Sequence, residues 1–134
     1  MFDSLDISAS GLVAQRVRMD TISSNIANQY TTGNAAGKAD PYKRKFTIFT
    51  SAANGAGVQV RSIDADNSPG PLKYDPGHEH AIKSGPEAGY VRMPNVDLNI
   101  EMTNAIEATR AYEANISALQ VTKQMYAADL RILA

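Results

Sequence analysis

The sequence predicts an α+β fold in which long N- and C-terminal helices pair as an antiparallel, coiled-coil-like arm, with a small β-rich module between them. Apolar residues recur at helical spacing in residues 1–29 and 95–134, whereas the middle shows short alternating stretches separated by Gly and Pro clusters. Each terminal helix would be marginal alone in water, so the two are expected to bury their facing stripes together. The expected organisation is a helical assembly domain (1–29 plus 95–134), a loop (30–41) and a β-rich module (42–94).

The first 29 residues favour a helix with Asp3 and Ser4 as candidate N-caps. Its apolar stripe repeats every seven residues and is expected to face the C-terminal helix through Leu5, Leu12, Met19 and Ile26. Val13 and Val17 lie off this stripe, which indicates a second contact surface. Gly11 weakens the helix locally, by up to about 1 kcal/mol relative to Ala.

The middle of the chain reads as loops and short strands. Gly, Thr and Asn residues over 30–40 indicate a mobile loop. Alternating and β-branched or aromatic residues predict strands at 42–51, 58–63, 72–75 and 89–93, with a turn at 54–57. Residues 78–85 are too polar and irregular to assign.

Residues after Pro94 predict one long helix that Asn95 or Asp97 can cap, with Glu101 favourably placed near its positive end. Such a helix would be roughly 50 Å long, which exceeds the width of a compact domain of this size. Eleven positions, nine of them apolar, step by four and three residues along what we call the first stripe: Leu98, Met102, Ala105, Thr109, Tyr112, Ile116, Leu119, Lys123, Tyr126, Leu130 and Leu133. This stripe is expected to pair with the N-terminal helix at Met102, Tyr112, Ile116, Leu119, Tyr126 and Leu130.

A second stripe lies about 200° away around the same helix. It consists of Ala111, Ala114, Ala118, Val121, Met125, Ala128 and Ile132. A surface helix of a soluble protein needs only one apolar face. Two interpretations therefore stand: the helix lies in the middle of a bundle, or one face meets this chain and the other a neighbouring copy.

Composition and motifs argue against several classes of function. A net charge of −1 and no long basic run give no reason to expect nucleic acid, and no apolar stretch is long enough for a membrane span. The sequence has no cysteine, which excludes disulfides and thiol catalysis. His78 and His80 resemble metal ligands but have no third ligand at diagnostic spacing, so a solvated loop is expected. An enzyme built around these two histidines is the least favoured interpretation, and no cofactor or metal ion is expected.

At this point a family resemblance becomes visible. The run Ser24-Asn25-Ile26-Ala27-Asn28, followed by Thr31, resembles the signature of bacterial flagellar rod and hook proteins. Residues 89–97 (GYVRMPNVD), with Glu101-Met102, resemble the more specific signature of a proximal rod component in that family. Residues 41–45, 74–78, 108–115 and 123–125 resemble the same family, whereas 32–39 and 79–88 depart from it.

The resemblance implies a structural subunit of the flagellar basal body, exported unfolded by the flagellar type III apparatus without a cleaved signal peptide. The subunit would assemble helically in the periplasmic rod with other copies, with proximal and distal rod subunits and with the adaptor that joins the rod to the MS ring. The rod would transmit torque and line the export channel. A soluble coiled-coil scaffold or adaptor is the alternative.

We assign the first stripe to pairing within the chain and the second to neighbouring subunits. The expected subunit interface comprises Val13, Val17, Asn25, Asn28, Ala114, Ala118, Val121, Met125, Ala128 and Ile132.

Overall fold

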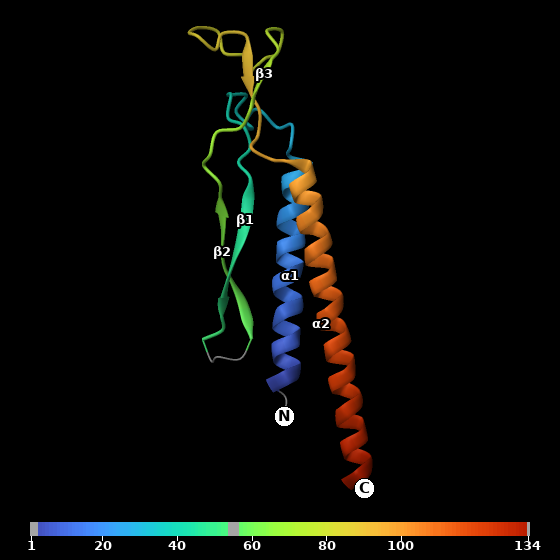
Figure 1. The fold of residues 1–134 in the computed structure, drawn as a ribbon. Coiled ribbons are helices and arrows are strands. Elements are labelled where there is room, and N and C mark those ends of the chain that lie inside the picture. Colours follow the sequence, from blue (N-terminus) through green and yellow to red (C-terminus); the bar gives the residue numbers. More distant parts are fainter. Residues whose placement is uncertain (1–2, 54–56, 134) are drawn as a thin grey trace.

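The structure is a computed structural model that describes the backbone over residues 3–53 and 57–133 and the side chains over 4–53 and 57–131. Its elements follow in the order α1 (Asp3–Ala27), β1 (Lys45–Ser51), β2 (Val58–Ala65), β3 (Leu72–Tyr74), β4 (Tyr90–Arg92) and α2 (Leu98–Leu133). The two helices pack antiparallel along an elongated arm, with two small antiparallel sheets between them in the sequence (Figure 1). The predicted fold class is therefore confirmed.

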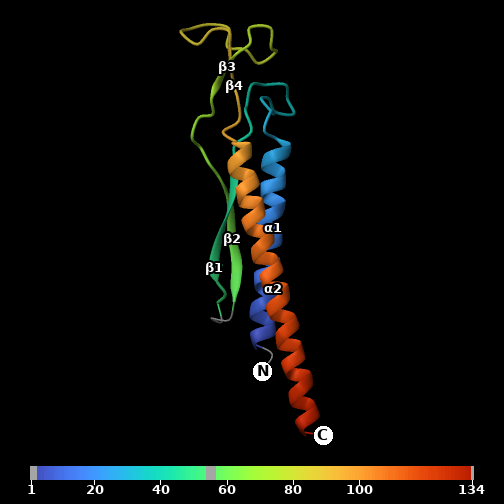
Figure 2. The same cartoon turned by 45° about the vertical axis from the view of Figure 1, so that its right-hand side comes forward.

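α1 lies between the other two long elements. It contacts α2 on one side and the β1–β2 hairpin on another, and both views show the hairpin running along the arm (Figures 1 and 2). α2 extends past the start of α1, so its last turns project beyond the arm, while β3 and β4 form a tip at the opposite end. Within the described residues, neither helix is long and apolar enough to cross a membrane.

The β1–β2 hairpin runs from Lys45↔Ala65 to Ser51↔Val58, with a register shift between Ile48 and Phe49. Ile48 pairs with Ser62 and Phe49 with Val60, which leaves Arg61 as the extra residue of a β-bulge. Exposure alternates along β2 from Val58 to Ile63, whereas along β1 the four residues from Thr47 to Thr50 are all half-buried, so the alternation expected for the first strand is not seen in its burial. Residues 54–56 of the predicted turn lie outside the described residues.

The first strand is three residues shorter than predicted. The backbone N–H of Tyr42 donates to Thr31 O, and that of Arg44 donates to the Asn95 side chain, so both groups bind loops. Strand β2 is two residues longer than predicted because its pairing continues to Ala65. β3 and β4 pair from Leu72↔Arg92 to Tyr74↔Tyr90, close to the predicted ranges.

The loop over 30–41 and the start of α2 are held by local hydrogen bonds. The 30–41 segment closes on itself through a bridge between Gly33 and Ala39, with Asn34 Oδ1 accepting two backbone N–H bonds. Asp97 caps α2, because its Oδ1 accepts from the N–H groups of Asn99 (2.8 Å) and Ile100 (3.4 Å).

The core is small. Among the described residues, the buried apolar side chains are Ala14, Ile22, Val91, Pro94 and Ala108. Several buried positions are instead polar, with Asn25 and Glu101 completely inaccessible to solvent. Buried polar groups must be hydrogen-bonded to be tolerated, so the connections of these two residues decide how the arm is held together.

Candidate functional site: a polar junction and open helix faces

Asn25 is the centre of a polar cluster at the end of the arm where α1 finishes and α2 begins. Its Nδ2 donates to Lys45 O (2.7 Å) and to Glu101 Oε2 (3.0 Å). Its Oδ1 accepts from Lys45 N–H (2.9 Å) and Tyr42 OH (3.1 Å). A primary amide offers two donors and two acceptor sites, so every one is used. One side chain thereby joins α1, β1 and α2.

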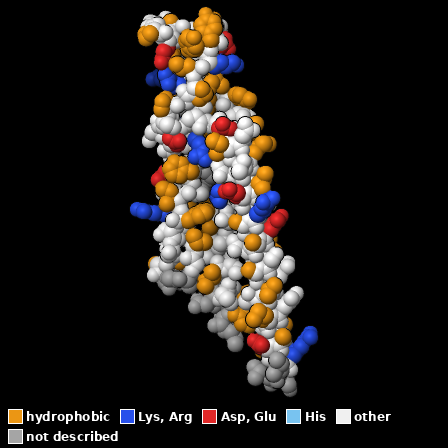
Figure 3. All heavy atoms as spheres, in the orientation of Figure 1, with side chains coloured by type: hydrophobic (Ala, Val, Ile, Leu, Met, Phe, Trp, Pro, Cys, Tyr) orange, Lys and Arg blue, Asp and Glu red, His pale blue; other side chains and the backbone are white. Residues whose placement is uncertain are grey.

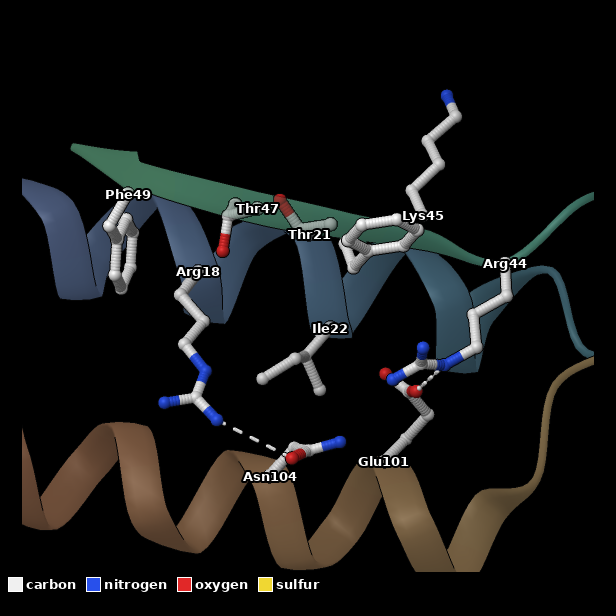
Figure 4. Close-up of a pocket in the computed structure, with 10 residues that line it drawn as sticks. Arg18, Thr21, Ile22, Arg44, Lys45, Thr47, Phe49, Glu101 and Asn104 are labelled. Atoms are coloured by element: carbon white, nitrogen blue, oxygen red, sulfur yellow. Dashed lines mark hydrogen bonds and ion pairs between the residues drawn. The ribbon is translucent and has the colours of Figure 1, made fainter. Parts of the chain in front are cut away.

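Glu101 carries the cluster's buried charge. Its Oε1 accepts from Arg44 Nε at 2.6 Å while Oε2 accepts from Asn25, and Figure 4 shows Arg44 and Glu101 pointing toward one another. A buried carboxylate is stable only when it is paired and hydrogen-bonded, and losing one partner costs several kcal/mol. The backbone of Arg44 is held in turn by Asn95, whose Nδ2 donates to Asp66 O. We call Asn25, Tyr42, Arg44, Asn95 and Glu101 the polar junction.

One residue of the predicted subunit interface, Asn25, belongs to the polar junction instead. Asn25 is completely buried inside its own chain, so it cannot contact a neighbouring subunit without unfolding the junction. Asn28 is half-buried and makes local bonds: its Nδ2 donates to Ser24 O (2.8 Å), and its Oδ1 accepts from Thr31 Oγ1 (3.2 Å). Asn25 and Asn28, both in the run that resembles rod and hook proteins, therefore hold the end of α1 in place.

Most of the polar contacts between α1 and α2, and a close approach at Gly11, follow a line one residue before the predicted one on α1. Four contacts along it come from residues seven apart: Ser4 Oγ with Tyr126 OH (3.0 Å), Gly11 beside Asn115, Arg18 NH2 with Glu107 (3.3 Å), and Asn25 with Glu101. The helices approach so closely at Gly11 that a Cβ there would lie 2.8 Å from Asn115 Nδ2. Small and polar side chains thus contribute directly to the contact between the helices. Ser4, a predicted cap, lies within the helix instead.

The apolar residues predicted for this pairing are half-buried in most cases. They are Leu5, Leu12, Met19, Ile26, Tyr112, Ile116, Leu119 and Tyr126. Met19 reaches α2 directly, since Thr109 Oγ1 donates to its Sδ at 3.8 Å.

Two predicted pairing residues on α2 are not placed between the helices. Met102 is 54% exposed because its neighbour Glu101 turns toward α1 to bind Asn25. Leu130 is 69% exposed because α2 has by then run past Ser4, near the start of α1. The first stripe is therefore covered by this chain only along its middle.

The second stripe of α2 is open to solvent. Val121 and Met125 are 54% and 62% exposed, and Ala114, Ala118 and Ala128 are also exposed. Hydrophobic side chains reach the surface at intervals along α2 in the space-filling view (Figure 3). On α1, Val13 is exposed and Val17 half-buried. The side chain of Ile132 lies outside the described residues.

The remaining candidate sites, at His80 and in a hollow beside the polar junction, are occupied by contacts within the chain. The ring of His80 packs over Gly33, and its Nδ1 lies 3.0 Å from Thr32 Oγ1, so the solvated environment expected for it is wrong. No three His, Asp or Glu side chains gather to hold a metal ion among the residues that the structure describes. A hollow of about 270 Å³ between α1, α2 and the hairpin is lined by Arg18 and Arg44 (Figure 4), and each is already paired with a glutamate.

Comparisons with known proteins agree with this architecture of terminal helices. A family described as flagella basal body rod protein matches residues 5–33, and one described as flagellar basal body rod FlgEFG protein C-terminal matches residues 87–132. A flagellar basal-body rod protein FlgC from Borreliella burgdorferi is 42% identical, over 99% of this chain and 97% of the relative. The chain belongs to the FlgC family of flagellar basal-body rod proteins.

Two further FlgC proteins support the same membership. The one from Bacillus subtilis is 42% identical over 98% of this chain and 97% of its own length, and the one from Salmonella typhimurium is 38% identical over 93% and 92%. This FlgC-family chain is a structural subunit of the rod in the flagellar basal body, where it assembles with other rod components. The two family matches cover α1 and α2, the elements that the junction joins.

Sequence patterns indicate neither the ion pair between Arg44 and Glu101 nor the part that Asn25 plays in joining it to both helices. From the sequence, Glu101 is expected only to interact favourably with the positive end of α2, and Arg44 only falls within the predicted strand at 42–51. A signal was present, however: an Arg and a Glu of opposite charge lie within the segments that resemble the family. Sequence alone gives no distance between them.

Proposed function

We propose that this subunit belongs to the proximal rod, where copies assemble helically to transmit torque and to surround the export channel. The helical assembly domain (1–29 plus 95–134) would form the inner contacts and the β-rich module (42–94) the outer ones. The observation that supports this most is the open second stripe, which lies on a helix whose other face is already used within the chain. Soluble monomers rarely leave such a face uncovered.

Burial energies favour covering this stripe on assembly. Completing the burial of a half-exposed Val121 or Met125 side chain would contribute about 1 kcal/mol each. The small exposed residues between them, Ala114, Ala118 and Ala128, would let a neighbouring backbone come close. The few buried apolar side chains of the single chain are consistent with a protein that completes its core against other molecules.

Torque transmission requires stiffness, which close packing and fixed connections provide. The polar junction supplies one such connection, because it joins both helices to the hairpin through a saturated amide and a buried ion pair. The proposed partners are other copies, the proximal and distal rod subunits and the adaptor to the MS ring. The flagellar type III apparatus would export the chain to the periplasm without a cleaved signal.

Substitution of Val121 tests the proposed interface. Val121→Asp places a charge on the open stripe, so the arm and the β strands should remain folded while incorporation into rods is lost. Gln120→Asp is the matched control, because Gln120 is an exposed polar neighbour one position away. The measurements are circular dichroism of the purified chain and its recovery in isolated basal bodies. Normal incorporation of Val121→Asp would show that the second stripe is not an interface.

A further inference from the structure

One side chain of the tip reaches the loop that follows α1. The ring of His80 packs over Gly33 so closely that a Cβ there would collide with it, and its Nδ1 lies 3.0 Å from Thr32 Oγ1. Loop 30–41 lies at the end of the arm from which the tip projects (Figures 1 and 2). Among the residues that the structure describes, no other hydrogen bond joins residues 75–89 to this loop. His80 therefore connects the tip to the loop.

Both sides of this contact are held in place by backbone hydrogen bonds. On the tip, Ile82 N–H donates to Tyr90 O at 2.9 Å, so His80 lies on a segment that is bound to β4. On the loop, Asp40 N–H donates to Thr32 O at 3.1 Å, and Thr32 itself is buried. The ring therefore meets a fixed partner, and its position determines how the tip lies against the loop.

The second ring nitrogen of His80 is buried without a partner. Its Nε2 is inaccessible to solvent and has no hydrogen-bond partner among the described residues. A neutral imidazole carries one N–H and one bare nitrogen, and a hydroxyl can either donate or accept, so the bond to Thr32 forms with either tautomer. A protonated ring carries an N–H on both nitrogens. A charged donor would then be buried at Nε2 without an acceptor, which is costly.

His78 is the ionisable residue in contact with His80. The two ring centroids lie 5.5 Å apart, and His78 Nδ1 accepts from His80 N–H at 3.1 Å. Protonation of His78 at this nitrogen would remove the acceptor and place a second positive charge beside the first. The other charged side chains of the two segments are those of Lys38, Asp40, Asp75, Glu79, Lys83 and Glu87. Among the described residues, no carboxylate forms an ion pair with either imidazole.

From these observations we propose that His80 is a pH-sensitive latch between the tip and the arm. With a neutral ring the latch is closed, and the tip is fixed against loop 30–41. Protonation favours an open state, in which the ring reaches water and the tip moves about its connections to the arm, residues 66–71 and 93–97. Because the open state binds the additional proton more readily, the latch closes as pH rises and opens as pH falls, over roughly pH 5–8. The latch lies within one chain and does not depend on the proposed rod assembly.

Because the sequence has no cysteine, distances between two spin labels can test the latch. Ser23→Cys/Lys73→Cys places one label on α1 and one on β3, both at exposed positions. Double electron–electron resonance on the purified full chain should give a narrow distance peak at about pH 8 and lose it at about pH 5. Adding His80→Ala should abolish the narrow peak at both pH values. Ser23→Cys/Gln120→Cys is the control pair, because both labels lie on the arm, and its peak should stay narrow throughout.

Two further variants separate the latch from other effects of acid. Thr32→Val removes the hydroxyl that His80 binds without adding a charge, so the narrow peak of the tip pair should be lost even at about pH 8. This variant tests the contact independently if His80→Ala fails to fold. His78→Ala should keep the narrow peak at about pH 8 and the response to acid. A tip pair that ignores pH, an unchanged response in His80→Ala, or a control pair that broadens equally would each overturn the proposal.

Discussion

Replacing Asn25 by Ala should weaken the fold more than any substitution of an exposed residue. The change removes four hydrogen bonds, two of them to the backbone of Lys45, one to Tyr42 and one to the buried carboxylate of Glu101. Neutral hydrogen bonds contribute about 1 kcal/mol each and those to charged groups about 2 kcal/mol. Allowing for water that enters the space, the free energy of unfolding should fall by about 4 kcal/mol.

Such a loss is large against the roughly 5–15 kcal/mol that stabilises a typical domain. Urea unfolding of the purified chain, followed by circular dichroism, measures it as a shift in the midpoint. Asn28→Ala is the matched control, because Asn28 belongs to the same run but makes only local bonds to Ser24 and Thr31. It should cost about 1 kcal/mol or less. If Asn25→Ala cost no more than this control, the junction would not be what joins the two helices.

Three further predictions concern other parts of the molecule. Gly70→Ala should lower the melting temperature by several degrees, because the new Cβ would collide with the carbonyl oxygen of Met93. In an NMR titration, the pKa of Asp66 should lie below its ordinary value, because the backbone N–H and then the hydroxyl of Ser68 bond to its carboxylate. Its stabilising contribution is therefore present above the unfolded pKa and is lost as pH falls through the lowered one. Hydrogen exchange in the dilute monomer should be fast at both chain ends and slow down on assembly.

Each of these has a result that would contradict it. Gly77→Ala is the control for the glycine, because a Cβ there would meet only Asp75 Oδ1 at 3.8 Å; an equal effect of both would rule out the collision. Ser68→Ala should raise the pKa of Asp66 only in part, since the backbone bond remains, and no change would remove the hydroxyl's role. Strong protection of both chain ends in the dilute monomer would show that neither end needs a partner to become ordered.

The elements of this fold could be predicted from the sequence because their patterns are local. Helical spacing located both helices, and alternation with turn residues located all four strands. The rotation of the helices about their axes could not be predicted in the same way. Apolar periodicity predicts pairing through Leu12 and Met19, and the structure adds contacts at Gly11 and Arg18 that this periodicity does not indicate. A close helix approach is made by small residues and by side-chain hydrogen bonds, and neither contributes to an apolar pattern.

The same limit explains the error at Asn25. Its place in a run resembling rod and hook proteins suggested a surface between subunits, but the bonds it makes are with segments 20 and 76 residues away in the sequence. Hydrogen bonds between segments far apart in the chain produce no periodic pattern in the sequence. The exposure of Leu130 also follows from a quantity outside the pattern, namely the unequal lengths of the helices, 25 and 36 residues.

The antiparallel arm has a consequence for the order of folding. The bond between Ser4 and Tyr126 joins residues 122 positions apart, and the junction joins the end of α1 to the start of α2. The β1–β2 hairpin, by contrast, closes over a short loop and can form early. A chain that emerges with its N-terminus first can therefore form the β1–β2 hairpin before α2, with which α1 pairs, has emerged. The arm closes only once the final quarter of the chain has been released, so premature locking of the helices is avoided by topology alone.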